Sequence, residues 1–86
     1  MKQVILDGAV LHRSSLHDIL SCELAFPAWY GRNLDALYDC LTDLGEDTEL
    51  LLRRWDRWED LHYAQRLLRV FRDAALANEK LHIIVE

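Results

Sequence analysis

The 86-residue chain has few of the residues that build cofactor, metal or membrane sites. Its three glycines lie far apart and form no phosphate-binding loop. The four histidines and two cysteines show neither the spacing of metal ligands nor a Cys-x-x-Cys pair, and no nucleophile motif accompanies them. No apolar run approaches the roughly 18 residues of a membrane span. We therefore expect no catalytic residues, no metal, no cofactor and no membrane association.

Length and cysteine usage narrow the class of protein further. Two cysteines are too few for a disulfide framework, and the first residues (MKQVILD) lack the long apolar stretch of a signal peptide. We expect a cytoplasmic protein, where thiols stay reduced. Hydrophobic residues make up 51% of the chain and charged residues 29%, an ordinary globular mixture. A chain of this length has room for one small core, so residues 1–86 are expected to form a single domain.

Negative charge is concentrated in the first half of the chain. Residues 1–49 carry three basic and nine acidic residues, whereas residues 50–86 carry seven basic and six acidic residues. Contacts to nucleic acid need clustered lysine and arginine, so this balance argues against RNA or DNA as the direct ligand. It fits a basic protein partner, or simply a well-solvated surface.

Local patterns predict three strands and about four helices. Strands are expected at residues 3–6, 49–53 and 81–85. A first helix is expected from the capping pattern at Ser15, and a second from Asn33 to a terminal glycine at Gly45. A short third helix is expected from the capping pattern at Asp56, and a long fourth helix covers residues 63–75 and ends near Asn78. Helical crossovers between strands favour an α/β domain with a three-stranded parallel sheet.

The second predicted helix carries an acidic row. Asp35, Asp39 and Asp43 are spaced four residues apart, so they share one helix face, and no lysine or arginine accompanies them on the helix. Three interpretations remain open: a solvated face, a ridge that docks into a basic cleft, or a metal site. A straight row of carboxylates rarely converges on one ion, which disfavours the metal site. Trp29 and Tyr30 directly precede this helix; aromatic residues beside charges are typical of interface anchors, and we expect one of the two to lie in the core.

Residues 29–42 (WYGRNLDALYDCLT) closely resemble the signature of the barstar family of intracellular ribonuclease inhibitors. The resemblance extends to residues 24–27 (LAFP), residues 70–74 (VFRDA) and both terminal strands, and so covers nearly the whole chain. It implies a small α/β domain with a three-stranded parallel sheet. It also implies a non-enzymatic inhibitor whose second helix and preceding loop mimic RNA phosphates in the active site of a secreted guanyl-specific ribonuclease.

The resemblance also implies a set of contact residues and a partner. The principal acidic contacts would be Asp35 and Asp39, with aromatic and peripheral contacts around them. The full set of candidate partner-binding residues is Trp29, Tyr30, Gly31, Asn33, Asp35, Tyr38, Asp39, Thr42, Asp43 and Asp73. The implied partner is a basic extracellular ribonuclease or a ribonuclease toxin domain, bound one to one.

The chain departs from the family pattern at several contact positions. Trp29 replaces a tyrosine, Tyr38 replaces a tryptophan, and Asp43 replaces a glycine. Arg32 stands where an acid is common, and we predict that it pairs with an acidic group of the partner and so contributes to specificity. These differences leave room for an alternative, an immunity or regulatory protein with the same fold that binds another basic protein or toxin domain.

Overall fold

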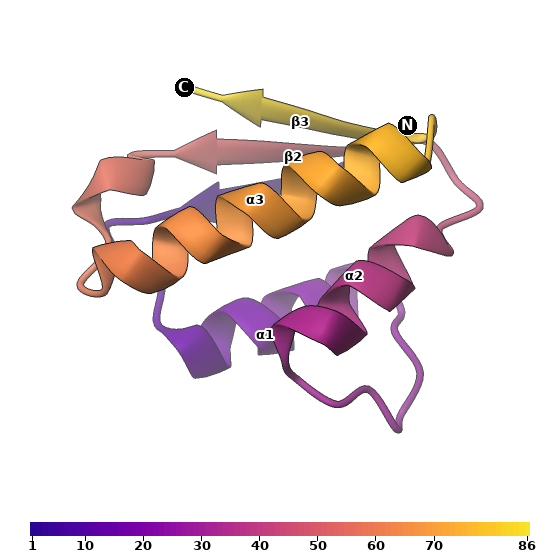
Figure 1. The fold of residues 1–86 in the computed structure, drawn as a ribbon, viewed down its shortest axis with the longest axis horizontal. Coiled ribbons are helices and arrows are strands. Elements are labelled where there is room, and N and C mark those ends of the chain that lie inside the picture. Colours follow the sequence, from indigo (N-terminus) through magenta and orange to yellow (C-terminus); the bar gives the residue numbers. More distant parts are fainter.

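The computed structural model describes all 86 residues and contains a three-stranded sheet and three α-helices (Figure 1). The elements follow in the order β1 (Lys2–Asp7), α1 (Arg13–Glu23), α2 (Leu34–Thr42), β2 (Thr48–Arg53), a 3-10 turn η1 (Trp55–Arg57), α3 (Leu61–Ala77) and β3 (Leu81–Val85). The sheet order is β1-β2-β3, and both strand pairs are parallel. The prediction of a small α/β fold with a three-stranded parallel sheet is therefore confirmed. The prediction of about four helices is wrong by one.

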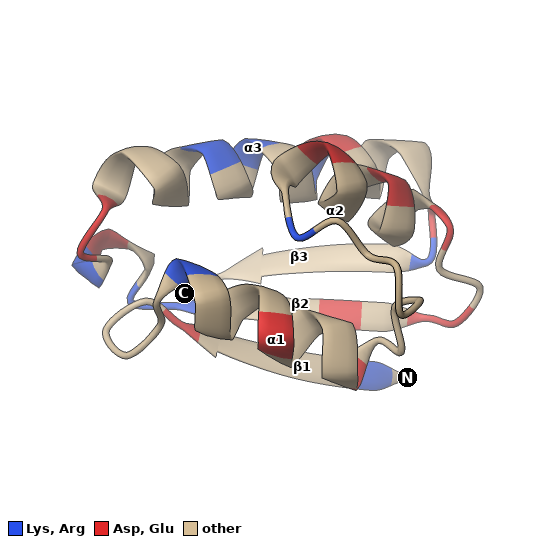
Figure 2. Ribbon diagram, turned by 90° about the horizontal axis from the view of Figure 1, so that it is seen from below, with Lys and Arg blue, Asp and Glu red and all other residues tan.

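All three helices cover the same face of the sheet (Figures 1 and 2). Strand side chains alternate accordingly: Val4 and Leu6 of β1 are buried under the helices, whereas Ile5 between them is 52% exposed. The core is one cluster of 19 buried apolar residues between sheet and helices, with Phe71 of α3 fully buried at its centre. This layering leaves the outer surfaces of the helices free to meet other molecules.

The helix that was expected to begin at Asp56 is absent, and the chain there forms the short turn η1. Trp55 and Trp58 on either side of it are buried, with ring centroids 5.3 Å apart, and the indole nitrogen of Trp55 donates to the carbonyl of Ala64 at 2.9 Å. Burial of both rings therefore stabilises a turn here more than a helix from Asp56 would be stabilised by its capping pattern. The next helix, α3, begins instead after Asp60, whose carboxylate accepts a hydrogen bond from the Tyr63 amide at 3.0 Å.

The first helix also begins earlier than the sequence indicated. Its N-cap is His12, and Ser15 occupies the third helical position after the cap, N3. The hydroxyl of Ser15 accepts from the His12 amide at 2.9 Å, so the serine closes the capping box from inside the helix. The helix ends at Glu23, before Pro27.

Asn33 caps the start of α2 as predicted, because its side-chain oxygen accepts from the Ala36 amide at 2.8 Å. The predicted glycine cap at its end is wrong: no glycine in the chain has a positive φ, and the C-cap residue is Asp43. None of the three helices has the length and apolar character to cross a bilayer.

Candidate partner-binding site

The acidic row on α2 is fully presented to solvent. Asp35, Asp39 and Asp43 are all exposed, and their carboxylates form no ion pair or side-chain hydrogen bond within the chain. Figure 2 shows that acidic residues, in red, lie along α2. No three histidine, cysteine, aspartate or glutamate side chains cluster in a way that could hold a metal ion. The row thus forms an acidic ridge of carboxylates that have no ion-pair partner in the chain, on a rigid element.

The two loop aromatics have different environments, as expected. Trp29 is 82% exposed, whereas Tyr30 is 8% exposed and belongs to the core. The Tyr30 hydroxyl lies 2.6 Å from Nδ1 of His17, and its ring packs against Phe26 with centroids 4.9 Å apart. The side chain of Tyr30 therefore fastens the loop, and its place among the candidate contact residues stays a prediction.

Arg32 already has partners inside the chain. Its backbone is left-handed, with φ 54°, and its Nη2 donates to Asp18 of α1 at 2.5 Å and to the carbonyl of Ser14 at 3.1 Å. Tertiary contacts thus bring an acidic group of the same chain, Asp18, to this base. Arg32 ties the loop before α2 to α1. A specificity role for its remaining donors stays a prediction.

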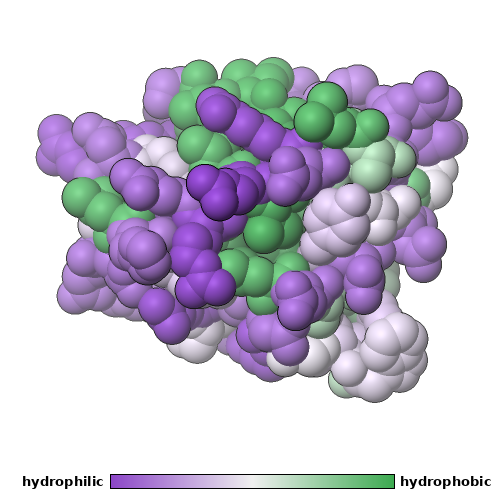
Figure 3. Space-filling view, in the orientation of Figure 1, coloured by the Kyte–Doolittle hydropathy of each residue, from purple (hydrophilic) through white to green (hydrophobic).

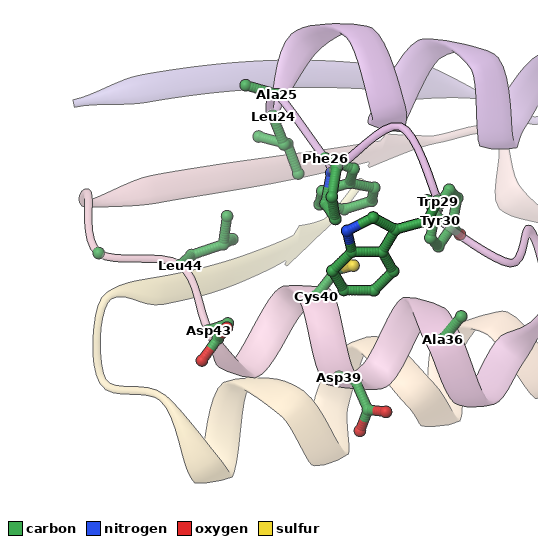
Figure 4. Close-up of a pocket in the computed structure, with 12 residues that line it drawn as sticks. Leu24, Ala25, Phe26, Trp29, Tyr30, Ala36, Asp39, Cys40, Asp43 and Leu44 are labelled. Atoms are coloured by element: carbon green, nitrogen blue, oxygen red, sulfur yellow. The ribbon is translucent and has the colours of Figure 1, made fainter.

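A hollow of about 440 Å³, the apolar hollow, lies beside α2 on the side of the loop (Figure 4). In this view the indole of Trp29 extends from the loop toward Cys40 of α2, with Phe26 above it and Leu44 farther to the left. Burial raises the pKa of the Cys40 thiol, and the nearby Asp39 and Asp43 carboxylates raise it further, which favours the protonated thiol over the reactive thiolate. The apolar hollow is lined by Leu24, Ala25, Phe26, Pro27, Trp29, Tyr30, Ala36, Asp39, Cys40, Asp43, Leu44 and Gly45.

A second hollow of about 510 Å³, the arginine hollow, lies at the N-terminal end of α2. Arg13, Arg32 and Arg66 line it together with Asp35, and Tyr63 is a further wall residue. Sequence reasoning missed Arg13 and Arg66. They come from α1 and α3, more than fifty positions apart, and no local pattern connects them. The acidic ridge thus lies between an apolar hollow and a hollow rich in arginine.

The remaining candidate residues lie around this ridge. Gly31 and Asn33 are exposed in the loop, although the Asn33 side chain is engaged as the helix cap. Tyr38 is 36% exposed, and the hydroxyl of Thr42 shares its hydrogen between the carbonyls of Tyr38 and Asp39 in its own helix, at 3.0 Å each. Asp73 is exposed on α3, the helix that packs beside α2. The fold therefore places the loop, α2 and α3, which carry the candidate residues, next to one another.

Comparison with known proteins supports a family assignment. The family model described as "Barstar (barnase inhibitor)" matches residues 1–86. A protein of Bacillus subtilis (strain 168) named "Putative ribonuclease inhibitor YrdF" is 54% identical over 43 residues. That match covers 49% of this chain and 47% of the relative, so it spans about half the length of each protein.

Proposed function

Because the chain belongs to the barstar family, we propose that it inhibits a ribonuclease by inserting the acidic ridge of α2 and the preceding loop into the enzyme's active site. The observation that carries the proposal is the row of three exposed carboxylates, none with a partner in the chain, beside the exposed Trp29. A surface kept in this state is suited to meeting complementary charge. The partner we propose is a basic extracellular ribonuclease of the barnase type or a ribonuclease toxin domain, bound one to one in the cytoplasm.

The physical basis is competition for a cleft built to bind a polyanion. A ribonuclease holds RNA phosphates with arginine, lysine and histidine side chains, and carboxylates at fixed spacing on a helix can occupy the same places. Placement on α2 lowers the ordering cost of binding, since the helix is capped by Asn33 and packed through Leu37 and Leu41. Opposite charge on the two proteins speeds encounter and disfavours wrong partners.

Trp29 and the buried Tyr30 have different roles in this mechanism: Trp29 contacts the partner, and Tyr30 holds the loop in place. Tyr30 and Arg32 hold the loop through His17 and Asp18, so that the indole of Trp29 projects from a fixed base. A large aromatic ring presented in this way is the kind of side chain that dominates the energy of protein interfaces. The loop and the ridge therefore form one surface, with apolar contact on one flank and charge along the helix.

Inhibition of RNA cleavage tests the proposal. The purified chain is titrated against a panel of secreted guanyl-specific ribonucleases that includes barnase, and the inhibition constant is measured. Asp35→Ala and Asp39→Ala should each weaken the inhibited complex by about 2–5 kcal/mol, because truncation leaves cations of the enzyme buried without a partner.

Glu79→Ala is the matched control, since Glu79 is an exposed acid outside the ridge. It should leave inhibition unchanged. Equal inhibition by all three variants would show that the ridge is not the contact surface. Tight binding of a basic protein without any effect on RNA cleavage would favour the regulatory alternative.

A further inference from the structure

The arginine hollow brings three guanidinium groups together from three separate segments. Arg13 lies at the start of α1, Arg32 in the loop before α2, and Arg66 in the second turn of α3. Asp35, the first residue of the acidic ridge, lies on its wall. In the space-filling view, hydrophilic side chains cross the face formed by α3, with apolar atoms between them (Figure 3).

Two of the three arginines are held in place by acids of the same chain. Arg13 donates from Nη2 to Asp60 at 2.7 Å and stacks over the ring of Tyr63, with 4.1 Å from its guanidinium carbon to the ring centroid. Arg32 donates, also from Nη2, to Asp18. Both arginines use only this nitrogen in side-chain bonds, so their other donors remain free.

Arg66 has no such anchor. It is exposed on α3, and no acceptor within the chain takes a hydrogen bond or ion pair from it. Arg66 lines the same hollow as Arg13 and Arg32, and its guanidinium has five donors. Arg66 thus has free donors beside two arginines whose side chains are already held in place. Such an arrangement favours the binding of a planar anion.

We propose that the arginine hollow receives a carboxylate side chain of the partner protein, bound by Arg66 together with Arg13 and Arg32. The inference rests on the proposed function, because a ribonuclease that covers Asp35 also covers the hollow on whose wall Asp35 lies. A planar carboxylate matches the guanidinium fork, whereas RNA would bring a row of negatively charged phosphates against the neighbouring acidic ridge, which repels it. The partner then carries an acidic residue beside its basic cleft, and ribonucleases without that residue are inhibited less strongly.

The first test asks whether the hollow binds a carboxylate at all, and it needs no ribonuclease. Sodium acetate is titrated into the 15N-labelled chain, with sodium chloride at equal ionic strength as reference. The backbone amides of Ser14 and Asn33, which line the hollow, should shift in a saturable way with acetate. Arg66→Gln should abolish this shift, and Arg69→Gln should preserve it, because Arg69 is exposed on the same helix but does not line the hollow. Identical effects of acetate and chloride, or an acetate shift that survives in Arg66→Gln, would overturn the proposal.

The second test asks whether the carboxylate comes from the partner. The charge reversals Arg66→Glu and Arg69→Glu are compared in the inhibition assay with the ribonuclease panel. Arg66→Glu should raise the inhibition constant at least tenfold more than Arg69→Glu. If the two reversals have equal effects although acetate binds, the hollow serves a free small anion and the proposal is wrong. If the unmodified chain inhibits no ribonuclease, the proposed function is wrong. A carboxylate of a ribonuclease is then excluded as the occupant of the hollow, even if acetate binds there.

Discussion

The hydroxyl of Tyr30 lies 2.6 Å from Nδ1 of His17, and this buried contact joins the loop before α2 to α1. The other ring nitrogen of His17, Nε2, lies 2.9 Å from the hydroxyl of Tyr63 on α3. A neutral imidazole satisfies both contacts, since one nitrogen donates and the other accepts. Because the ring is 3% exposed, burial lowers the pKa of His17, and the nearby Arg32 guanidinium lowers it further.

This pKa shift predicts that the fold loses stability in mild acid. The unfolded chain takes up a proton on His17 near pH 6.5, whereas the folded chain takes it up only at lower pH. The unfolded state therefore binds more protons in this window, and the free energy of unfolding should fall as the pH drops from about 7 toward 5. Urea unfolding at several pH values, with the His17 ring titrated by NMR, measures both quantities. The exposed His82 serves as control, because His82→Gln should retain the dependence; an NMR pKa for His17 at or above 6.5 would refute this explanation.

The charge of Asp39 should lower the stability of the free protein. This residue has like charges four residues away on both sides, and Asp39→Asn relieves two repulsions worth together roughly 0.4–1 kcal/mol. The variant should be neutral to slightly stabilised in urea at low salt and should bind the ribonuclease more weakly. Asp35→Asn is the matched comparison: Asp35 lies in the first turn of α2, where the helix dipole favours its charge, so it should not gain stability. A loss of more than about 1 kcal/mol in Asp39→Asn would mean that Asp39 makes a structural contact.

Asn78 should be needed for the end of α2. Its side-chain nitrogen donates to the carbonyls of Leu41 and Leu44, at 3.0 Å each, in a partly buried position. Asn78→Ala leaves both carbonyls without this donor and should cost about 1–3 kcal/mol in denaturant unfolding. Asn78→Asp retains the acceptor for the Lys80 amide but loses the donor, so it should be destabilised as well. Wild-type stability in both variants would show that α2 ends independently of this contact.

Trp29 should matter for binding and hardly for folding. Because its side chain is 82% exposed, Trp29→Ala should change the free energy of unfolding by no more than about 0.5 kcal/mol. The same change should weaken the ribonuclease complex by about 2 kcal/mol or more, as measured by calorimetry. Leu76→Ala removes an equally exposed apolar side chain from α3, outside the proposed contact surface, and should leave the affinity unchanged. Equal losses of affinity in the two variants would indicate a nonspecific apolar contribution.

Charge complementarity should be visible in the kinetics of association. Steering acts over about one Debye length, roughly 10 Å at 0.1 M salt, so the association rate should fall steeply as salt rises while dissociation changes much less. Stopped-flow mixing with the ribonuclease at several salt concentrations measures both rates. Neutralising Asp35, Asp39 and Asp43 together to asparagine should flatten the dependence. An association rate of the unmodified chain that does not change with salt would mean that the acidic residues do not steer the encounter.

The sequence by itself determined the strands, the long helix and the acidic ridge. Period-two and period-3.6 patterns are local, and residues 81–85 form β3 as predicted. The cap at Asn33 and the row from Asp35 to Asp43 likewise depend only on neighbours within one or two helical turns. Parallel pairing of the strands was predicted as well, because helical crossovers between strands favour a parallel sheet.

Only the tertiary structure decided how the site is supported and flanked. Burial of Trp55 and Trp58 replaced the expected helix at Asp56 by a turn, because packing against the core outweighs a weak capping pattern. Tyr30 lies in the core, where its hydroxyl meets the distant His17, and Trp29 lies at the surface; Arg32 pairs with Asp18 of α1. The arginine hollow exists because three segments remote in sequence converge on one point. Such convergence depends on the packing of the whole chain, so no local pattern of residues predicts it.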